Sequence, residues 1–414
     1  MADLSKDLYG TVTDDDGQAT QREARNGGKH MVSLSLTKVA DGLIDPKLVL
    51  SWLMNALGAP AVLIGLLVPV REAGALLPQM LMAGWVQSLE HRKWAWVLGC
   101  LGQGVAAFVI ALAALMLQGW IAGGVIVAAL AVLAVSRALC SVSYKDILGK
   151  TIPKTRRGAV KGVAGSVSSA AVIVFALLLM SGLLQDVTPL ALAVGFAACL
   201  WLLAALLFSR LEEEASERGA RDTLDFTPIR EDAQFRRFVA VRGLLTVTAL
   251  APPYLVLLAG DSALQGLGAM VLASSLAAFL SSYVWGRLSD QSSRRVLALS
   301  GFGGAVAMAL AVAVSLAGWA GPIWVLPVIL FVLMIAYQGV RSGRGIYLVD
   351  MAPEDGRASY AALANTLIGG LLLVTGLIGG GLSFIGPVAA LAGFALLSLA
   401  GGALALGLKE VEQG

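Results

Sequence analysis

The polar stretch GRLSDQSSRR, residues 286–295, recurs in weaker form about 200 residues earlier in the chain. GWVQSLEHRK, residues 84–93, aligns with it at an offset of 202 and shares the first glycine and the final basic pair. A second pair of segments, PKTRR (153–157) and PEDGR (353–357), aligns in the same order at an offset of 200. Two such pairs at nearly the same offset indicate an internal duplication.

The composition is that of a membrane protein. Of the 414 residues, 57% are hydrophobic and 14% are charged, whereas soluble globular proteins carry about 25% charged residues. Apolar segments recur along most of the length, and each can cross the ~30 Å hydrocarbon core of a bilayer as a helix. The net charge of +3 and the lack of a basic patch interleaved with aromatic residues indicate no nucleic-acid partner.

Together, the duplication and the apolar segments predict an all-α membrane protein with twelve transmembrane helices in two pseudo-symmetric six-helix bundles. We expect bundles at 33–209 and 238–408, joined by a central cytoplasmic loop at 210–237. A disordered cytoplasmic tail is expected at 1–32 and a short cytoplasmic tail at 409–414. The expected helices are 33–57, 61–87, 94–117, 121–149, 158–182, 188–209, 238–259, 264–287, 297–317, 323–350, 359–381 and 386–408.

Lysine and arginine are distributed unequally between the two sides of this map. The loops expected in the cytoplasm carry basic residues, among them Arg92, Lys93, Arg156 and Arg294. The positive-inside rule therefore predicts a multi-pass protein of the inner (plasma) membrane with both termini in the cytoplasm. The six opposite loops contain no lysine or arginine; they lie near 58–60, 118–121, 183–188, 260–263, 318–322 and 382–387.

The stretch GLLVPVREAGALLPQM, residues 65–80, places Arg71 and Glu72 inside an apolar run. If they formed a loop, Arg71 would be the only basic residue on the outer side. The duplication places both residues near the midpoint of the helix expected at 61–87. Ionisable residues at that depth are a functional-site hypothesis by default.

Several of these features resemble the major facilitator superfamily. They include the six-plus-six arrangement, the central loop, and a G-x-x-x-D-x-x-x-R-R loop after the second helix of a half. The segment LVDMAPEDGRA, residues 348–358, resembles the family's D-x-x-P-x-x-x-R connection. The resemblance implies that two bundles pack around a central solute cavity and rock to expose it to alternate sides. The loop motif is matched by Gly286, Asp290, Arg294 and Arg295.

The charged residues of these loops have two interpretations. Basic residues at cytoplasmic helix ends favour the topology and interact well with helix dipoles. Alternatively, the loop charges latch the closed inner gate and separate when it opens. The first-half copy departs from the family pattern, because Ser88 replaces the usual aspartate and His91 a frequent glycine. The candidate gating residues are Asp290, Arg294, Arg295, Asp350 and Arg357.

Each half also contains ionisable residues well inside its expected helices. An insertion cost of about 2.5–3.5 kcal/mol for each at a helix centre requires that they face one another or a wet cavity. One interpretation is that they form structural ion pairs, with Asp45–Arg71 or Glu72–Arg137 as partners. Asp41 and Asp45 are four residues apart in the expected helix, so we expect both to lie on the same helix face. Arg242 adds a milder polar contribution. The other interpretation is a transport cavity with substrate-binding candidates Arg71, Arg137, Tyr144, Tyr337, Arg341, Arg344 and Asn365 and proton-binding candidates Asp41, Asp45 and Glu72.

Three functions fit this pattern. The first is a proton-driven secondary active transporter of a small polar solute with an anionic group, because a carboxylate that loses its arginine neighbour can bind a proton. The second is a proton antiporter that exports drugs or amphipathic cations, although helix 158–182 lacks the Gly-Pro signature usual in such exporters. The third is a non-transporting assembly factor or receptor of the same fold, which would have little use for a charged core.

No catalytic constellation stands out, so we expect no enzyme activity, no cofactor and no metal. The three cysteines have no metal-ligand spacing, and His30 and His91 are isolated and expected to be exposed. Gly376 and Gly380 form a G-x-x-x-G pattern that is expected to permit close helix packing. We expect a monomer whose partners are the solute, protons and the lipid bilayer.

Overall fold

The computed structural model of the chain describes residues 20–153, 156–184, 186–215, 226–259, 263–353 and 357–411. Within these ranges, every element of regular secondary structure is a helix. Most of the expected N-terminal tail lies outside the described residues. The side chains of two candidate gating residues, Asp290 and Arg357, also lie outside the described part.

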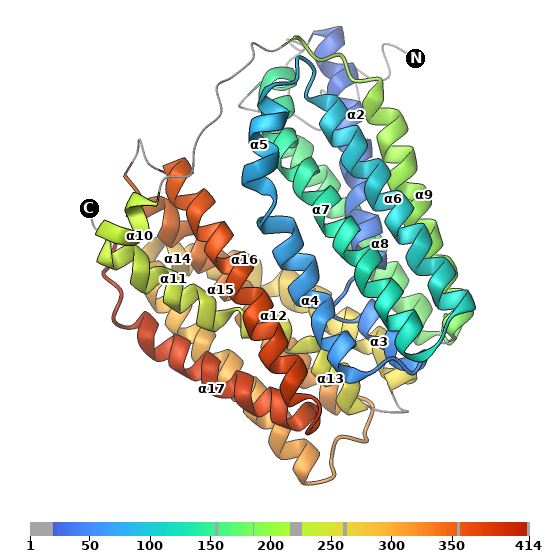
Figure 1. Ribbon diagram of the computed structural model, residues 1–414, viewed down its shortest axis with the longest axis vertical. Helices are drawn as coiled ribbons and strands as arrows, with labels where there is room; N and C mark the ends of the chain where they lie inside the picture. The colour runs from blue at the N-terminus through green and yellow to red at the C-terminus, as the bar shows by residue number, and fades with distance from the viewer. Residues whose placement is uncertain are drawn as a thin grey trace.

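The helices form two bundles, which Figure 1 shows side by side. The N-terminal bundle, blue to green in the figure, consists of α2 (Gln21–Leu43), α3 (Val49–Ala56), α4 (Ala61–Leu76), α5 (Gln79–Gln87), α6 (Lys93–Met116), α7 (Gly119–Thr151), α8 (Arg157–Met180) and α9 (Val187–Ser209). The C-terminal bundle, yellow-green to red, consists of α10 (Thr227–Glu231), α11 (Ala233–Leu245), α12 (Val247–Leu250), α13 (Pro252–Ala259), α14 (Ala263–Leu316), α15 (Val325–Met351), α16 (Arg357–Leu382) and α17 (Pro387–Ala405).

Most of these helices can cross a membrane. Within the described residues, nine helical segments are long and apolar enough, and a tenth results if α4 and its bent continuation in α5 form one span. The remaining candidates are interrupted or short: the broken pair α2 and α3, and the apolar segment 266–281 of α14. The all-helical membrane fold is thus confirmed, whereas the exact count of twelve spans stays a prediction.

Proline and aspartate interrupt the first expected span. The sequence predicts one helix over 33–57, but α2 ends at Leu43 and α3 begins at Val49. Pro46 has no backbone N–H to continue the helix, and the Asp45 carboxylate accepts from the N–H groups of Lys47 (2.7 Å) and Leu48 (3.2 Å). The expectation that Asp45 shares a helix face with Asp41 is therefore wrong, because the helix ends before residue 45.

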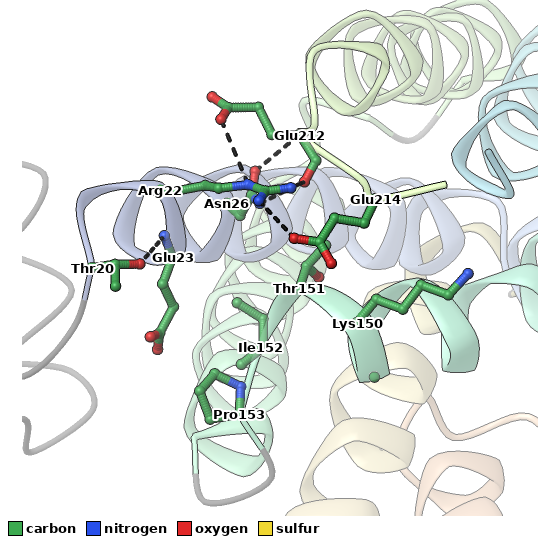
Figure 2. Close-up of a pocket in the computed structure, with 11 residues that line it drawn as sticks. Thr20, Arg22, Glu23, Asn26, Lys150, Thr151, Ile152, Pro153, Glu212 and Glu214 are labelled. Atoms are coloured by element: carbon green, nitrogen blue, oxygen red, sulfur yellow. Dashed lines mark hydrogen bonds and ion pairs between the residues drawn. The ribbon is translucent and has the colours of Figure 1, made fainter. Parts of the chain in front are cut away.

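α2 also begins earlier than expected. It starts at Gln21, so the expectation of disorder up to residue 32 is wrong for the described residues 20–32. The Asn26 amide donates to the Glu212 carbonyl oxygen (3.0 Å) and accepts from the Glu212 N–H (3.1 Å). Figure 2 shows this contact, with Arg22 beside the same segment. The polar side chains that suggested disorder bind the chain just after α9.

His30 lies within this early part of α2 and is buried, so the expectation of an exposed histidine is wrong. Its Nε2 atom lies 2.8 Å from the Thr151 hydroxyl, and its ring meets those of Tyr144 and Phe208 edge-on. The ring thereby fixes α2 against α7 and α9. The linear sequence could not reveal this, because the partners lie more than 100 residues away.

The two bundles meet along α4 and α16, which lie side by side in the middle of Figure 1. Glycines make the contact close: a Cβ atom added at Gly376 would clash with the Pro69 ring, and one at Gly380 would lie 3.2 Å from Val62. The predicted packing role of Gly376 and Gly380 is confirmed. A second contact joins α8 to α14, where Gly268 lies against backbone atoms of Met180 and Ala176.

These close contacts lie toward the loops that carry no basic residues. Val62 and Gly380 are near the loops at 58–60 and 382–387, and Met180 and Gly268 are near those at 183–188 and 260–263. Toward the opposite end, which carries α5 and α10, the bundles diverge (Figure 1). The interface is therefore closed at one end and splayed at the other.

Candidate functional site

The Asp41 carboxylate on α2 is held by two guanidinium groups of the N-terminal bundle. Arg71 of α4 donates Nη2 to one carboxylate oxygen at 2.7 Å, and Arg137 of α7 donates to the other. The expected pairs Asp45–Arg71 and Glu72–Arg137 are thus wrong in their partners, because both arginines converge on Asp41. Each guanidinium–carboxylate bond is a charge-assisted hydrogen bond of the strong class, so Asp41 joins α2, α4 and α7.

Glu72 faces a different environment from its neighbour Arg71. Adjacent residues on a helix point about 100° apart, so Arg71 turns to Asp41 while Glu72 turns to the C-terminal bundle. Glu72 lines a cavity there together with Tyr337, Arg341 and Arg344. Within the described part of the chain, its carboxylate makes no hydrogen bond and no ion pair within 4 Å. Of the three predicted proton-binding carboxylates, Glu72 is therefore the one without a hydrogen bond or ion pair within the described residues.

The C-terminal bundle lines this cavity with three arginines. Arg341 and Arg344 come from α15, and Arg242 comes from α11. Arg242 donates Nη2 to the Asn365 amide oxygen at 2.9 Å, while its buried Nε finds no partner among the described residues. The space between these groups is about 20 Å³, room for roughly one water molecule.

Lys47 connects the two bundles through Tyr337, which lines this space. Its ammonium lies 3.8 Å from the centroid of the Tyr337 ring, a cation–π contact between the α2–α3 break and α15. Lys47 was not among the site candidates predicted from the sequence, and Arg242 was noted only as a milder polar contribution. Each is a basic residue inside an apolar segment, so the same insertion-cost argument applied to every such residue would have included both.

A second cavity, of about 210 Å³, lies within the N-terminal bundle. It is lined by Asp41, Arg137, Tyr144 and Lys38, and it lies toward the basic end of α7. The Tyr144 hydroxyl is buried and finds no partner among the described residues. Asp41 and its arginine partner Arg137 therefore border a space large enough for a small solute.

The candidate gating residues lie at the basic end of the C-terminal bundle. Arg294 forms an ion pair with Glu410 at 2.7 Å, and Arg295 approaches the same carboxylate at 3.7 Å. Asp350 is exposed in the last turn of α15. The latch between the loop arginines and Asp290 stays untested, because the Asp290 side chain lies outside the described residues.

The first-half loop is also held by a glutamate, one that sequence reasoning missed, but through backbone hydrogen bonds. The buried carboxylate of Glu213, just beyond α9, accepts from the backbone N–H groups of Arg92 (3.1 Å) and Lys93 (2.8 Å). Glu410 stands at the corresponding place beyond α17. The duplication thus extends to a glutamate after the last helix of each half, although no motif in the sequence pointed to it.

Solved structures share the fold of this protein over nearly the whole chain. A D-xylose–proton symporter matches with a TM-score of 0.71 at 11% identity, covering 93% of this chain and 98% of the other. A POT family transporter in complex with 5-aminolevulinic acid matches with a TM-score of 0.70 at 10% identity, covering 92% and 96%. The chain has the major facilitator fold.

The nucleoside transporter NupG shares this fold as well, with a TM-score of 0.67 at 13% identity and coverage of 92% of this chain and 98% of the other. No family model matches the sequence, and no curated protein matches it. Similarity at this level of identity concerns the fold alone. The roles of individual residues must therefore be argued from this chain.

Within the described residues, no group of three or more His, Cys, Asp and Glu side chains is arranged to hold a metal ion. The site consists of guanidinium, carboxylate, ammonium and phenol groups that the two bundles contribute from opposite sides. Such groups can bind an anion and exchange a proton, and neither task forms or breaks a covalent bond to carbon.

Proposed function

We propose that the protein is a secondary active transporter that moves a small polar anionic solute by alternating access, coupled to protons. The observation that carries this proposal is the cavity between the bundles, where Arg242, Arg341 and Arg344 face the single carboxylate of Glu72. Charges at this depth are costly unless a partner neutralises them. An anionic solute supplies that partner, and the fold supplies a way to carry it across.

Alternating access is supported by the packing of the bundles. The glycine contacts between α4 and α16 close the end without basic loops, while the bundles diverge at the other end (Figure 1). We assign this arrangement to an inward-facing carrier in the inner membrane, with both termini in the cytoplasm and the protein monomeric. Arg294, Arg295, Asp290, Asp350 and Arg357 are proposed to act at the inner gate.

Glu72 is the carboxylate that we propose to carry the coupled proton. Asp41 is engaged by two arginines, and Asp45 accepts two backbone hydrogen bonds. Glu72 instead faces the arginines that bind the solute. A solute anion that takes over those guanidiniums removes the positive charge that stabilises the ionised carboxylate, so Glu72 binds a proton when the solute binds.

Transport by the purified chain in proteoliposomes tests the proposal. Labelled anionic, neutral and cationic solutes are offered with an inward proton gradient. We expect an anion to accumulate and its accumulation to collapse with a protonophore. Arg341→Gln should lower uptake at least tenfold, because it removes a charged hydrogen-bond donor from the site. Arg237→Gln, an exposed arginine outside the cavity, is the matched control.

Two results would contradict the proposal: accumulation of lipophilic cations but no anion, or wild-type anion uptake by Arg341→Gln. The first would favour the drug or amphipathic-cation exporter. Co-purification of a stoichiometric protein partner, with no flux of any solute, would favour a non-transporting assembly factor or receptor. The excess of cationic groups in the cavity argues against cation export, because like charges repel.

A further inference from the structure

The charge of the central cavity is not balanced by the residues that line it. The arginine triad, defined as Arg242, Arg341 and Arg344, contributes three guanidiniums that stay charged at any physiological pH. Glu72 is the only Asp or Glu among the described residues that line this cavity. Two positive charges are therefore left without a counter-charge.

The Arg242 guanidinium is held in position and has a hydrogen-bond donor left for a ligand. Its side chain is only 5% exposed, and the Asn365 amide fixes its orientation through Nη2 at 2.9 Å. The Nε atom remains unpartnered within the described part of the chain. A buried donor without an acceptor is costly, so the site gains most from a ligand that supplies one. The planar fork of Nε and Nη atoms matches the oxygens of carboxylates and phosphates.

We propose that the arginine triad binds a small dianion, either a phosphoryl group or a dicarboxylate. This inference rests on the proposed transport of an anionic solute and narrows it to two negative charges. Such a ligand neutralises the excess charge of the cavity. It also provides oxygens for the Arg242 Nε atom and for Arg341 and Arg344, which form no ion pair within the described residues.

The cavity is too small for a dianion unless the side chains around it rearrange. The space of about 20 Å³ holds no more than a water molecule, so a dianion enters only after the surrounding side chains move apart. Glu72 gives up its place facing the arginines, and the contact between Lys47 and Tyr337 breaks as the bundles separate. Binding of a dianion is thereby tied to a rearrangement between the bundles.

The test measures ligand-dependent thermal stabilisation of the full chain in detergent at constant ionic strength. The phosphoryl arm compares inorganic phosphate, above its second ionisation, with acetate. The dicarboxylate arm compares succinate with butyrate, which has the same carbon chain and one carboxylate. The variants are Arg242→Gln, Arg344→Gln and, as the matched control, Arg237→Gln. Phosphate also stabilises proteins non-specifically, so the readout is the difference between wild type and the triad variants.

We expect phosphate or succinate, but neither monoanion, to stabilise the wild type and Arg237→Gln. The triad variants should bind at least tenfold more weakly, the loss expected for one charged hydrogen-bond donor. The arm that responds identifies the ligand chemistry. Equal stabilisation by monoanions, undiminished stabilisation of both triad variants, or no stabilisation above the variant baseline in either arm overturns the dianion assignment. Proton-driven uptake of a monoanion in proteoliposomes would overturn it too, while leaving the proposed transport function intact.

Discussion

At the scale of single residues, the site is distinguished by how its three carboxylates are engaged. Asp41 pairs with two arginines, Asp45 binds the backbone at a helix break, and Glu72 is left to face the other bundle. The sequence predicted all three as proton-binding candidates. It could not distinguish them, because the difference depends on where α2 ends and which way adjacent helical residues point.

Asp45 is predicted to act through its hydrogen bonds to the backbone of the α2–α3 break rather than as a proton carrier. Asp45→Asn retains an oxygen that can accept the two backbone N–H groups, whereas Asp45→Ala removes it. We expect Asp45→Ala to lower the free energy of unfolding by about 1 kcal/mol and Asp45→Asn to change it little. Thermal unfolding in detergent measures both. Equal losses in the two variants would show that the negative charge, and not the hydrogen bonds, is what matters.

Asp41 is predicted to behave differently, because its charge matters as well as its oxygens. Asp41→Asn leaves the largely buried Arg71 without a counter-ion, and we expect a loss of about 1–3 kcal/mol in the free energy of unfolding. This loss is smaller than that for a fully buried ion pair, because the Arg137 side chain is 42% exposed and solvent screens its charge. Calorimetry alongside Asp45→Asn checks this. An equally small effect in both variants would contradict the double ion pair.

At the scale of helices, the apolar segments and the duplication predicted most spans to within a few residues. α6, α8 and α9 begin one residue before the starts predicted at 94, 158 and 188. The failures lie where a specific contact, long-range or local, outweighs composition. The polar residues 21–32 form a helix because they bind the segment after α9. α2 ends early because Pro46 has no backbone N–H to continue the helix, and because the Asp45 carboxylate offers its neighbours an alternative to helical hydrogen bonds.

The early part of α2 is predicted to lose stability in acid. His30 lies outside the span expected at 33–57, and burial lowers its pKa from about 6.5 to about 3. The unfolded state therefore binds a proton that the folded state does not, and stability falls as the pH decreases from about 6.5 toward 3, by up to about 1.4 kcal/mol per pH unit. Melting at several pH values, compared with His30→Asn, measures this; identical slopes would contradict it.

The contact between α4 and α16 is predicted to hold the outer end closed. Gly376→Val would push the Pro69 ring away, whereas Gly381→Val on the same helix adds a side chain where no other atom lies within 4 Å. We expect Gly376→Val, but not Gly381→Val, to shift the carrier toward opening at its outer end. Spin labels placed on both bundles report the distance between them. An unchanged distance distribution for Gly376→Val would contradict the assigned role.

At the scale of the whole molecule, the fold could be predicted from two weak repeats and an uneven distribution of charge. The central site was predicted only in outline, because the sequence grouped arginines from both halves, whereas among the described residues only those of the C-terminal half line the cavity with Glu72. The unbalanced charge of the arginine triad emerges only when the helices of the C-terminal bundle are placed together, since Arg242 and Arg344 are about 100 residues apart and belong to different helices.

The central claim is that Glu72 couples solute movement to protons. The most direct measurement compares wild type with Glu72→Gln in proteoliposomes, using the anion identified by the stabilisation and uptake screens. Exchange of labelled for unlabelled solute needs no net proton movement, whereas accumulation driven by a pH gradient does. We predict that Glu72→Gln retains exchange and loses gradient-driven accumulation. Gradient-driven accumulation equal to that of the wild type would contradict the account.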